Sequence, residues 1–234
     1  THDEFAGRIK PGFSAIADSL GVADCKGHGT HVAGILGGRT YGVAKNVNIF
    51  PLKVFDCNGS STISGILAAM DWIITNGKLP GVVNMSLGIS GSHSIDQGAA
   101  AVHNAGFVVV ASAGNFSGNA CEQSPARVSS VITVGSSDIT DTKSYFSNYG
   151  VCVDVFAPGA KVYSTTPQNE YDTKGGTSMA APAVAGVAVL VVDTAAVPYH
   201  WPGGRVVWPG PDPAVAISGW IRLSHCHRCS VPAL

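Results

Sequence analysis

Two runs of sequence decide the fold class, Val82-Val83-Asn84-Met85-Ser86-Leu87 and Phe107-Val108-Val109-Val110-Ala111-Ser112. Each is a short, mostly apolar segment. Residues 94–105 between them have helical spacing, with Ser94 as a candidate N-cap and Gly106 as a stop signal. Short apolar strands that alternate with helices are typical of a parallel sheet buried on both faces. The sequence therefore predicts an α/β fold, a parallel β-sheet with helices on both faces.

The same alternation continues on either side of this unit. Further strands are predicted at residues 48–55, 131–134 and 153–156, and further helices at residues 63–74 and from Ser178 to about Val192. Residues 193–234 contain proline- and glycine-rich runs at 198–204 and 208–213 and show no period of 2 or 3.6. We therefore expect one domain over residues 1–192, followed by a tail over 193–234 without a packed structure.

Composition excludes several classes of protein. The 234 residues are 45% hydrophobic, only 12% are charged, and the formal net charge is −1. A chain of this size and apolarity can bury a large core, which excludes a disordered protein. The balanced charge argues against a nucleic-acid binder or a polybasic membrane-surface protein. No run of about 18 apolar residues is present, so no membrane span is predicted.

The six cysteines leave two interpretations open. An even number is compatible with disulfides, but buried free thiols are compatible with it too. The final pair forms Cys226-His227-Arg228-Cys229. A single CxxC with one histidine is weak evidence for a metal, because a structural zinc site needs four ligands.

The segment Lys26-Gly27-His28-Gly29-Thr30-His31-Val32-Ala33-Gly34 is the first that could carry chemistry. The glycines on either side of His28 leave its imidazole open to a partner. His28 and His31 could instead be a metal pair, but no third ligand of fitting spacing follows. A dinucleotide-binding loop is disfavoured because Val32 stands where a third glycine is needed.

Two other segments could complete a site. Val110-Ala111-Ser112-Ala113-Gly114-Asn115 ends a strand in either an ordinary Gly-Asn turn or an amide donor at the carboxyl edge of the sheet. Gly175-Gly176-Thr177-Ser178-Met179-Ala180-Ala181-Pro182 places a serine at the start of an apolar helix, either as an N-cap or as a nucleophile beside free N–H groups. Together the three segments supply the base, the nucleophile and the oxyanion donors that serine chemistry needs.

These residues, in this order, resemble the subtilisin-like serine proteases, closest to the secreted proteinase K and aqualysin-like branch. The similarity covers residues 2 to about 192. Its seven ordered segments are Gly27–Gly34, Tyr41–Ala44, Asn84–Gly88, Ala113–Asn115, Phe146–Gly150, Ala157–Gly159 and Gly176–Pro182.

The resemblance implies a serine endopeptidase that acts on proteins or peptides and needs no cofactor for catalysis. It implies that His28 is the general base, Ser178 the nucleophile within hydrogen-bond reach of His28, and Asn115 an oxyanion donor. Gly59-Ser60-Ser61 and Ser86-Leu87-Gly88 would be the two extended strands that hold a substrate peptide between them by β-pairing. The implied protein is a secreted monomer that binds neither nucleic acid nor membrane.

The resemblance also implies two structural features. Cys25–Cys57 and Cys121–Cys152 match the disulfide pattern of the aqualysin-like branch, which indicates an extracellular setting. Asp154, with the carbonyls of Ser129 and Val131, corresponds to a structural calcium site of relatives.

The chain departs from the family pattern in three places. The family order is Asp, then His, then Ser, and the family aspartate would fall before Thr1, so the triad Asp is expected to be absent. Asp3, Asp18 and Asp24 do not lie in the Asp-Thr/Ser-Gly setting of that residue. Ala183 replaces a family histidine, and the tail after Val192 is unrelated. We therefore expect an incomplete subtilisin-like domain with little or no activity. The alternatives are a non-catalytic peptide-binding relative or an inert truncated product.

Overall fold

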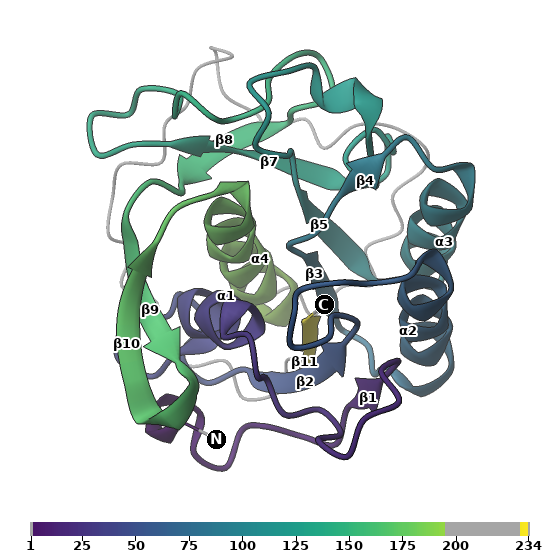
Figure 1. Ribbon diagram of the computed structural model, residues 1–234, viewed down its shortest axis with the longest axis vertical. Coiled ribbons are helices and arrows are strands. Elements are labelled where there is room, and N and C mark those ends of the chain that lie inside the picture. Colours follow the sequence, from purple (N-terminus) through teal and green to yellow (C-terminus); the bar gives the residue numbers. More distant parts are fainter. Residues whose placement is uncertain (1, 195–229, 234) are drawn as a thin grey trace.

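The computed structural model describes residues 2–194 and 230–233, and its main feature is a seven-stranded sheet (Figure 1). Neighbouring strands of this sheet are parallel. In spatial order the strands are β1 (Phe13–Ser14), β2 (Asn48–Lys53), β11 (Ser230–Ala233), β3 (Val82–Met85), β5 (Val108–Ser112), β7 (Ile132–Ser137) and β8 (Val155–Pro158).

The helices cover both faces of this sheet and create two cores. On one face lie α1 (His28–Gly37) and α4 (Thr177–Thr194), and on the other lie α2 (Ile63–Asn76) and α3 (His93–Asn104). Consecutive residues of β3 enter opposite cores: Val82 packs with α1 and α4, whereas Val83 packs with α2 and α3. A strand buried on both sides must be apolar at successive positions, so the predicted α/β class is confirmed.

Two antiparallel pairs lie outside the main sheet. The strand β4 (Ile89–Ser90) pairs with β6 (Gln123–Ser124), and β9 (Val162–Thr166) pairs with β10 (Glu170–Lys174). Short 3₁₀ helices are η1 (Asp3–Phe5), η2 (Ala120–Glu122) and η3 (Pro167–Asn169), the last of which connects β9 to β10. The β9–β10 hairpin is joined to α1, because Ser164 Oγ donates to the His31 carbonyl and Thr165 Oγ1 donates to the Thr30 carbonyl, both at 2.8 Å.

Two predictions about local structure are wrong. The N-cap of α3 is Ser92, not Ser94, because Ser92 is the last residue with extended φ and ψ before the helix. The tail was expected to lack structure, yet residues 230–233 form β11 between β2 and β3. The proline- and glycine-rich runs that suggested an unstructured tail, together with Cys226 and Cys229, lie outside the described residues.

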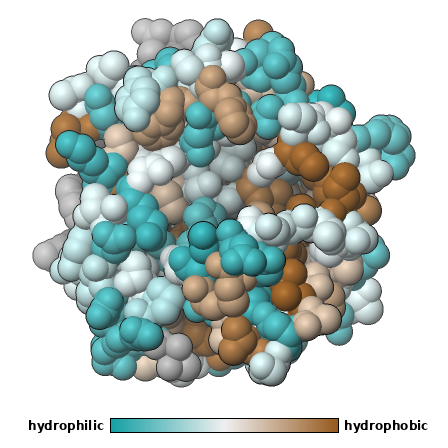
Figure 2. All heavy atoms as spheres, in the orientation of Figure 1, coloured by the Kyte–Doolittle hydropathy of each residue, from teal (hydrophilic) through white to brown (hydrophobic). Residues whose placement is uncertain are grey.

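Hydrophilic and hydrophobic residues are interspersed over the face shown in Figure 2. Within the part of the chain that the structure describes, none of the helices combines the length and apolarity needed to cross a membrane.

Candidate active site

The N-terminal turn of α4 carries Ser178 as its second residue. The Ser178 side chain is partly buried, and its hydroxyl donates to the Ser86 carbonyl at 3.3 Å. In return, the hydroxyl of Ser86 donates to the Ser178 carbonyl at 2.8 Å. These two contacts hold the serine against the segment that follows β3, at the carboxyl edge of the sheet.

The amide of Asn115 is oriented by a single neighbour, Thr177. Its Oδ1 accepts from the backbone N–H of Thr177 at 2.8 Å and from Thr177 Oγ1 at 2.9 Å. With the oxygen fixed in this way, Nδ2 remains the free donor of the amide. A Cβ placed on Gly176 would lie 3.5 Å from Asn115 Nδ2 and 3.7 Å from the Ser178 nitrogen. The absence of a side chain at Gly176 therefore leaves open the space that these two nitrogens border.

His28 is the first residue of α1. Val32 lies one turn further along α1, on the same face as His28, and packs in a small apolar cluster with Met179 of α4. Since Met179 is adjacent to Ser178, this packing brings the helix turns that carry His28 and Ser178 together. Burial lowers the pKa of His28, and the charge of Asp24 opposes that shift.

The hydrogen bond expected between Ser178 and His28 is not formed in this structure. Ser178 Oγ has the Ser86 carbonyl as its partner among the described residues. The physical reason is that the Ser178 hydroxyl can rotate and has one proton to donate, and the Ser86 carbonyl lies within reach of that proton.

The aspartates upstream of His28, none of which lies in the Asp-Thr/Ser-Gly setting, have other hydrogen-bond partners. Asp3 accepts from Asn169 Nδ2 at 2.8 Å, and Asp18 pairs with Lys53 at 2.7 Å. Asp24 accepts only from Lys26, Gly27 and Thr30. No carboxylate among the described residues is hydrogen-bonded to the His28 ring.

The two predicted substrate segments do not belong to strands. Gly59, Ser60 and Ser61 follow an exposed turn, in which the Ser60 carbonyl accepts from the Asp56 N–H at 2.9 Å. Ser86, Leu87 and Gly88 lie between β3 and β4, and the first two are buried. Neither segment has a strand partner within the described part of the chain, so their pairing with a substrate stays a prediction, and part of the Gly59–Ser61 backbone is hydrogen-bonded within the turn.

Both disulfides implied by the resemblance are present. The Cα atoms are 5.1 Å apart in Cys25–Cys57 and 5.3 Å apart in Cys121–Cys152. The first disulfide ties the loop that enters α1 to the loop that carries Gly59.

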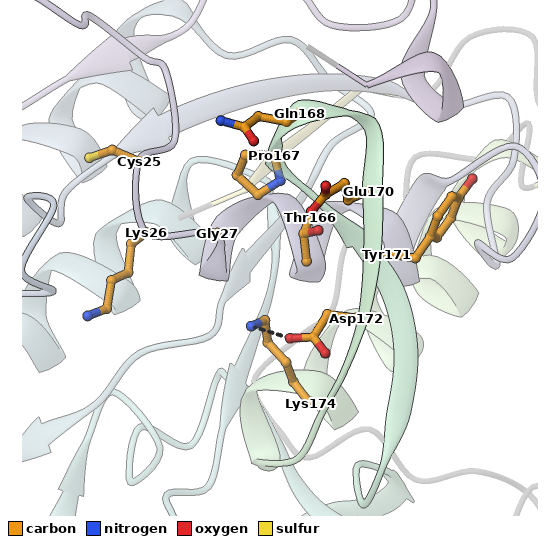
Figure 3. Close-up of a pocket in the computed structure, with 10 residues that line it drawn as sticks. All are labelled: Cys25, Lys26, Gly27, Thr166, Pro167, Gln168, Glu170, Tyr171, Asp172 and Lys174. Atoms are coloured by element: carbon orange, nitrogen blue, oxygen red, sulfur yellow. Dashed lines mark hydrogen bonds and ion pairs between the residues drawn. The ribbon is translucent and has the colours of Figure 1, made fainter.

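A polar cavity of about 510 Å³ lies beside the start of α1 and was not foreseen from the sequence (Figure 3). Its walls are Cys25, Lys26 and Gly27 on one side and the β9–η3–β10 segment on the other. Lys174 and Asp172 line the cavity as an ion pair at 3.1 Å. Asp172 and Lys174 were visible in the sequence as a charged pair before Gly175. They indicate a cavity only once the β9–β10 hairpin is known to lie against α1.

Asp154 immediately precedes β8, the strand at one edge of the main sheet. Its Oδ2 accepts from the Thr133 N–H at 2.8 Å. No group of three or more His, Cys, Asp or Glu side chains gathers around it or elsewhere in the described residues. A cation there would thus depend on Asp154 and backbone carbonyls.

Comparison with known proteins shows the family of this chain. The model of the subtilase family matches residues 1–203. The chain belongs to the subtilase family. Among curated relatives, this subtilase chain is 49% identical to an extracellular serine proteinase of Thermus sp. (strain Rt41A) over 192 residues, which cover 81% of the chain and 47% of the relative. It is 48% identical to the alkaline serine exoprotease A of Vibrio alginolyticus over 189 residues, 81% of the chain and 35% of the relative.

A solved structure gives the same result for the fold. A cold-adapted subtilisin-like serine proteinase superposes with a TM-score of 0.80 and 47% sequence identity, covering 82% of this chain and 70% of that one. The predicted subtilisin-like fold is confirmed. The subtilase chain spans less than half the length of the Thermus and Vibrio relatives, at 47% and 35%.

Proposed function

We propose that the subtilase domain of this chain is a serine endopeptidase that hydrolyses peptide bonds through an acyl-enzyme. The observation that carries this proposal is the arrangement around Thr177. One residue both fixes the amide of Asn115 and begins the helix whose next residue is Ser178. If Ser178 were only an N-cap and Asn115 only a turn residue, the Asn115 Nδ2 and the Ser178 N–H would not need to border the same space beside Gly176.

The chemistry assigns one task to each group. Ser178 Oγ attacks the carbonyl carbon of the scissile bond, and His28 accepts its proton. The negative oxygen that forms is stabilised by Asn115 Nδ2 and by the backbone N–H of Ser178. His28 then donates the proton to the leaving amine. Water repeats the sequence on the acyl-enzyme, which releases the acid and restores Ser178.

The protein of residues 1–234 should turn over slowly, because no described carboxylate orients the His28 ring. In subtilisin, removal of the triad aspartate alone lowers kcat by about 3 × 10⁴. Residual catalysis would come from Asn115 and the N-terminus of α4. A peptide-binding relative without activity remains the second candidate, and the same assay separates the two.

The test is hydrolysis of a broad peptide substrate by residues 1–234, with products read by mass spectrometry. The Thermus relative is assayed in parallel, and the Ser178→Ala variant is the blank. The proposal predicts slow cleavage that Ser178→Ala abolishes and that is at least about 10³-fold below the relative. Cleavage unaffected by Ser178→Ala would overturn the assignment. Cleavage as fast as the relative would overturn the role given to the missing carboxylate.

We further propose that Asp154, with the Ser129 and Val131 carbonyls, holds a structural calcium ion. Calcium takes six to eight oxygen ligands, among which backbone carbonyls and carboxylates are common. The support is that the Asp154 carboxylate accepts from the N–H of Thr133 in β7, the strand that follows Ser129 and Val131 in the sequence. Calcium should raise the thermal midpoint of the wild type but not of Asp154→Asn, whereas an equal rise in both would contradict the site. Secretion is proposed from the two disulfides and from the extracellular relative.

A further inference from the structure

Asp24 has a hydrogen-bond arrangement that the proposed chemistry does not use. Its Oδ1 accepts from the backbone N–H of Lys26 at 2.9 Å and of Gly27 at 2.7 Å. Its Oδ2 accepts from the N–H and from the Oγ1 of Thr30, both at 2.7 Å. A carboxylate has about four lone-pair sites, so this one is fully satisfied.

These bonds organise the turn that presents His28. Gly27 is the N-cap of α1, has φ +84°, and offers no side chain to cap the helix. Asp24 takes over that task, since the Thr30 N–H that it binds is one of the donors an α-helix leaves free in its first turn. His28 and Gly29 lie between these anchors, so the backbone position of His28 is set from both sides by one carboxylate.

The same carboxylate also carries the charge that favours the imidazolium form of His28. Burial and the charge of Lys174 lower the pKa of His28, and the charge of Asp24 raises it. Lys174 faces this region from β10 as a partner of Asp172, and Lys26 donates to the Asn58 carbonyl at 3.3 Å. His31, one turn further along α1, bonds through Nε2 with the Asp172 carbonyl at 3.1 Å.

We propose that Asp24 is a positioning residue for the general base, acting through the N-terminal turn of α1 and through its charge, not through a hydrogen bond to the ring. This inference rests on the proposed role of His28. It assigns to Asp24 part of the electrostatic support that a triad carboxylate would give, without the control of ring orientation, because all four lone-pair sites are occupied.

The experiment compares Asp24→Asn with a matched control. Asp138 holds its own loop in the same way, because it accepts from the N–H and Oγ1 of Thr140 and from the N–H of Thr142. This loop follows β7 and is not part of the turn that carries His28. Asp138→Asn therefore removes an equivalent charge and loop anchor away from α1. A third variant, Thr30→Val, removes one bond to Asp24 while it keeps the charge.

The first measurement is an NMR titration of the His28 ring in each variant, which needs no catalytic activity. Asp24→Asn should lower the pKa of His28, whereas Asp138→Asn and Thr30→Val should leave it unchanged. The second measurement is the rate at which a fluorophosphonate labels Ser178. It should fall roughly 3- to 30-fold in Asp24→Asn, less than the ~10²-fold effect of a full 1 Å misplacement.

An unchanged His28 pKa in a folded Asp24→Asn variant would overturn the proposal. So would an equal shift in Asp138→Asn. If Asp24→Asn does not fold, Asp24→Glu keeps the charge and moves it, and a wild-type pKa and labelling rate in that variant would contradict the positional role. Failure of Ser178 to be labelled in the wild type would count against the proposed function, while the NMR titration would still test Asp24.

Discussion

The N-terminal ends of α1 and α4 are built alike but differ in charge. At α1, Thr30 donates through its N–H and its Oγ1 to one oxygen of Asp24, each at 2.7 Å. At α4, Thr177 donates through the same two groups to one oxygen of Asn115, at 2.8 and 2.9 Å. Thr30 anchors a side chain from the loop just before its helix, and Thr177 anchors one from a distant segment, yet one anchored group is an anion and the other is a neutral amide.

The difference matches the charge that each helix end would meet during the proposed reaction. His28 becomes a cation when it accepts a proton, and a fixed carboxylate nearby stabilises it. The oxygen that forms next to Ser178 becomes an anion, and it needs a donor instead of a second negative charge. The same arrangement, a threonine that donates twice to one side-chain oxygen, thus holds a carboxylate where a cation would form and an amide where an anion would form.

The largest effect should follow when the two ends are made alike in charge. Asn115→Asp keeps the acceptor for Thr177 but replaces the Nδ2 donor by a negative oxygen. Loss of one oxyanion donor in subtilisin lowers kcat by about 10²–10³, and the added charge should carry the loss beyond that range. The measurement is the rate of Ser178 labelling by a fluorophosphonate. Asn119→Asp is the matched control, because its Oδ1 accepts from the Cys121 N–H at 3.0 Å outside the site. A wild-type rate in Asn115→Asp would remove the amide from the mechanism.

A smaller effect is expected when the space between the donors is filled. Gly176 has φ +155°, and a methyl group there would lie 3.5 Å from Asn115 Nδ2. Gly176→Ala should slow labelling about 10- to 100-fold, below or near the loss of one donor. It should also lower the thermal midpoint, because a side chain at this φ is strained. Gly118→Ala, whose Cβ would have no contact nearer than 3.9 Å, should change neither property. Retained labelling in Gly176→Ala would show that the oxyanion forms elsewhere.

A milder change loosens the α4 anchor without altering charge. Thr177→Val removes Oγ1, which donates to Asn115 and accepts from the Gly114 N–H at 3.1 Å. We expect a free energy of unfolding lower by about 1 kcal/mol, because a partly buried N–H loses its acceptor. Labelling should slow only a few-fold, since the Thr177 N–H still holds the amide. Thr133→Val, a buried threonine that donates to the Ala126 carbonyl at 2.6 Å, should lose stability but label normally. Normal labelling in both would show that Oγ1 does not orient Asn115.

The smallest effect concerns pH. Burial lowers the pKa of His28 below its ordinary value of 6.5, so the neutral base persists into mildly acidic solution. The acid limb of the labelling rate should therefore lie below pH 6.5. For stability the sign follows from proton binding: the unfolded chain takes up the His28 proton first, so acid destabilises the fold as the pH falls through the unfolded pKa. An acid limb above pH 6.5 would contradict the buried environment of His28.

Much of the fold and of the site could be predicted from local sequence. The strands β3 and β5 are apolar at most successive positions, which predicts a sheet buried on both faces. His28, Asn115 and Ser178 lie in motifs that follow one another in a recognisable order. The β9–β10 hairpin could not be predicted in this way, because Tyr163 and Asp172 carry no strong pattern and the hairpin is held by contacts to α1. The strand β11 was not predicted from the sequence either. Its Pro232 argues against a central strand, since proline cannot donate to the ladder, and only the position between β2 and β3 makes it one.

The partner of Ser178 was also beyond sequence reasoning. Motifs place side chains on helix ends, but a hydroxyl takes whichever acceptor lies within reach, here the Ser86 carbonyl. The role of Asp24 was hidden for the opposite reason. Its sequence setting excluded it from the triad, and only the four hydrogen bonds reveal what the carboxylate does.

The central claim is that the ends of α1 and α4 form one serine-hydrolase site. Its most direct test is to treat the folded chain with a fluorophosphonate and to map the adduct by mass spectrometry, beside Ser178→Ala, His28→Ala and heat-unfolded samples. We expect a single adduct on Ser178 that is absent from Ser178→Ala and from the unfolded chain and forms much more slowly in His28→Ala. An adduct on another residue, or equal labelling of Ser178 with and without His28, would contradict it.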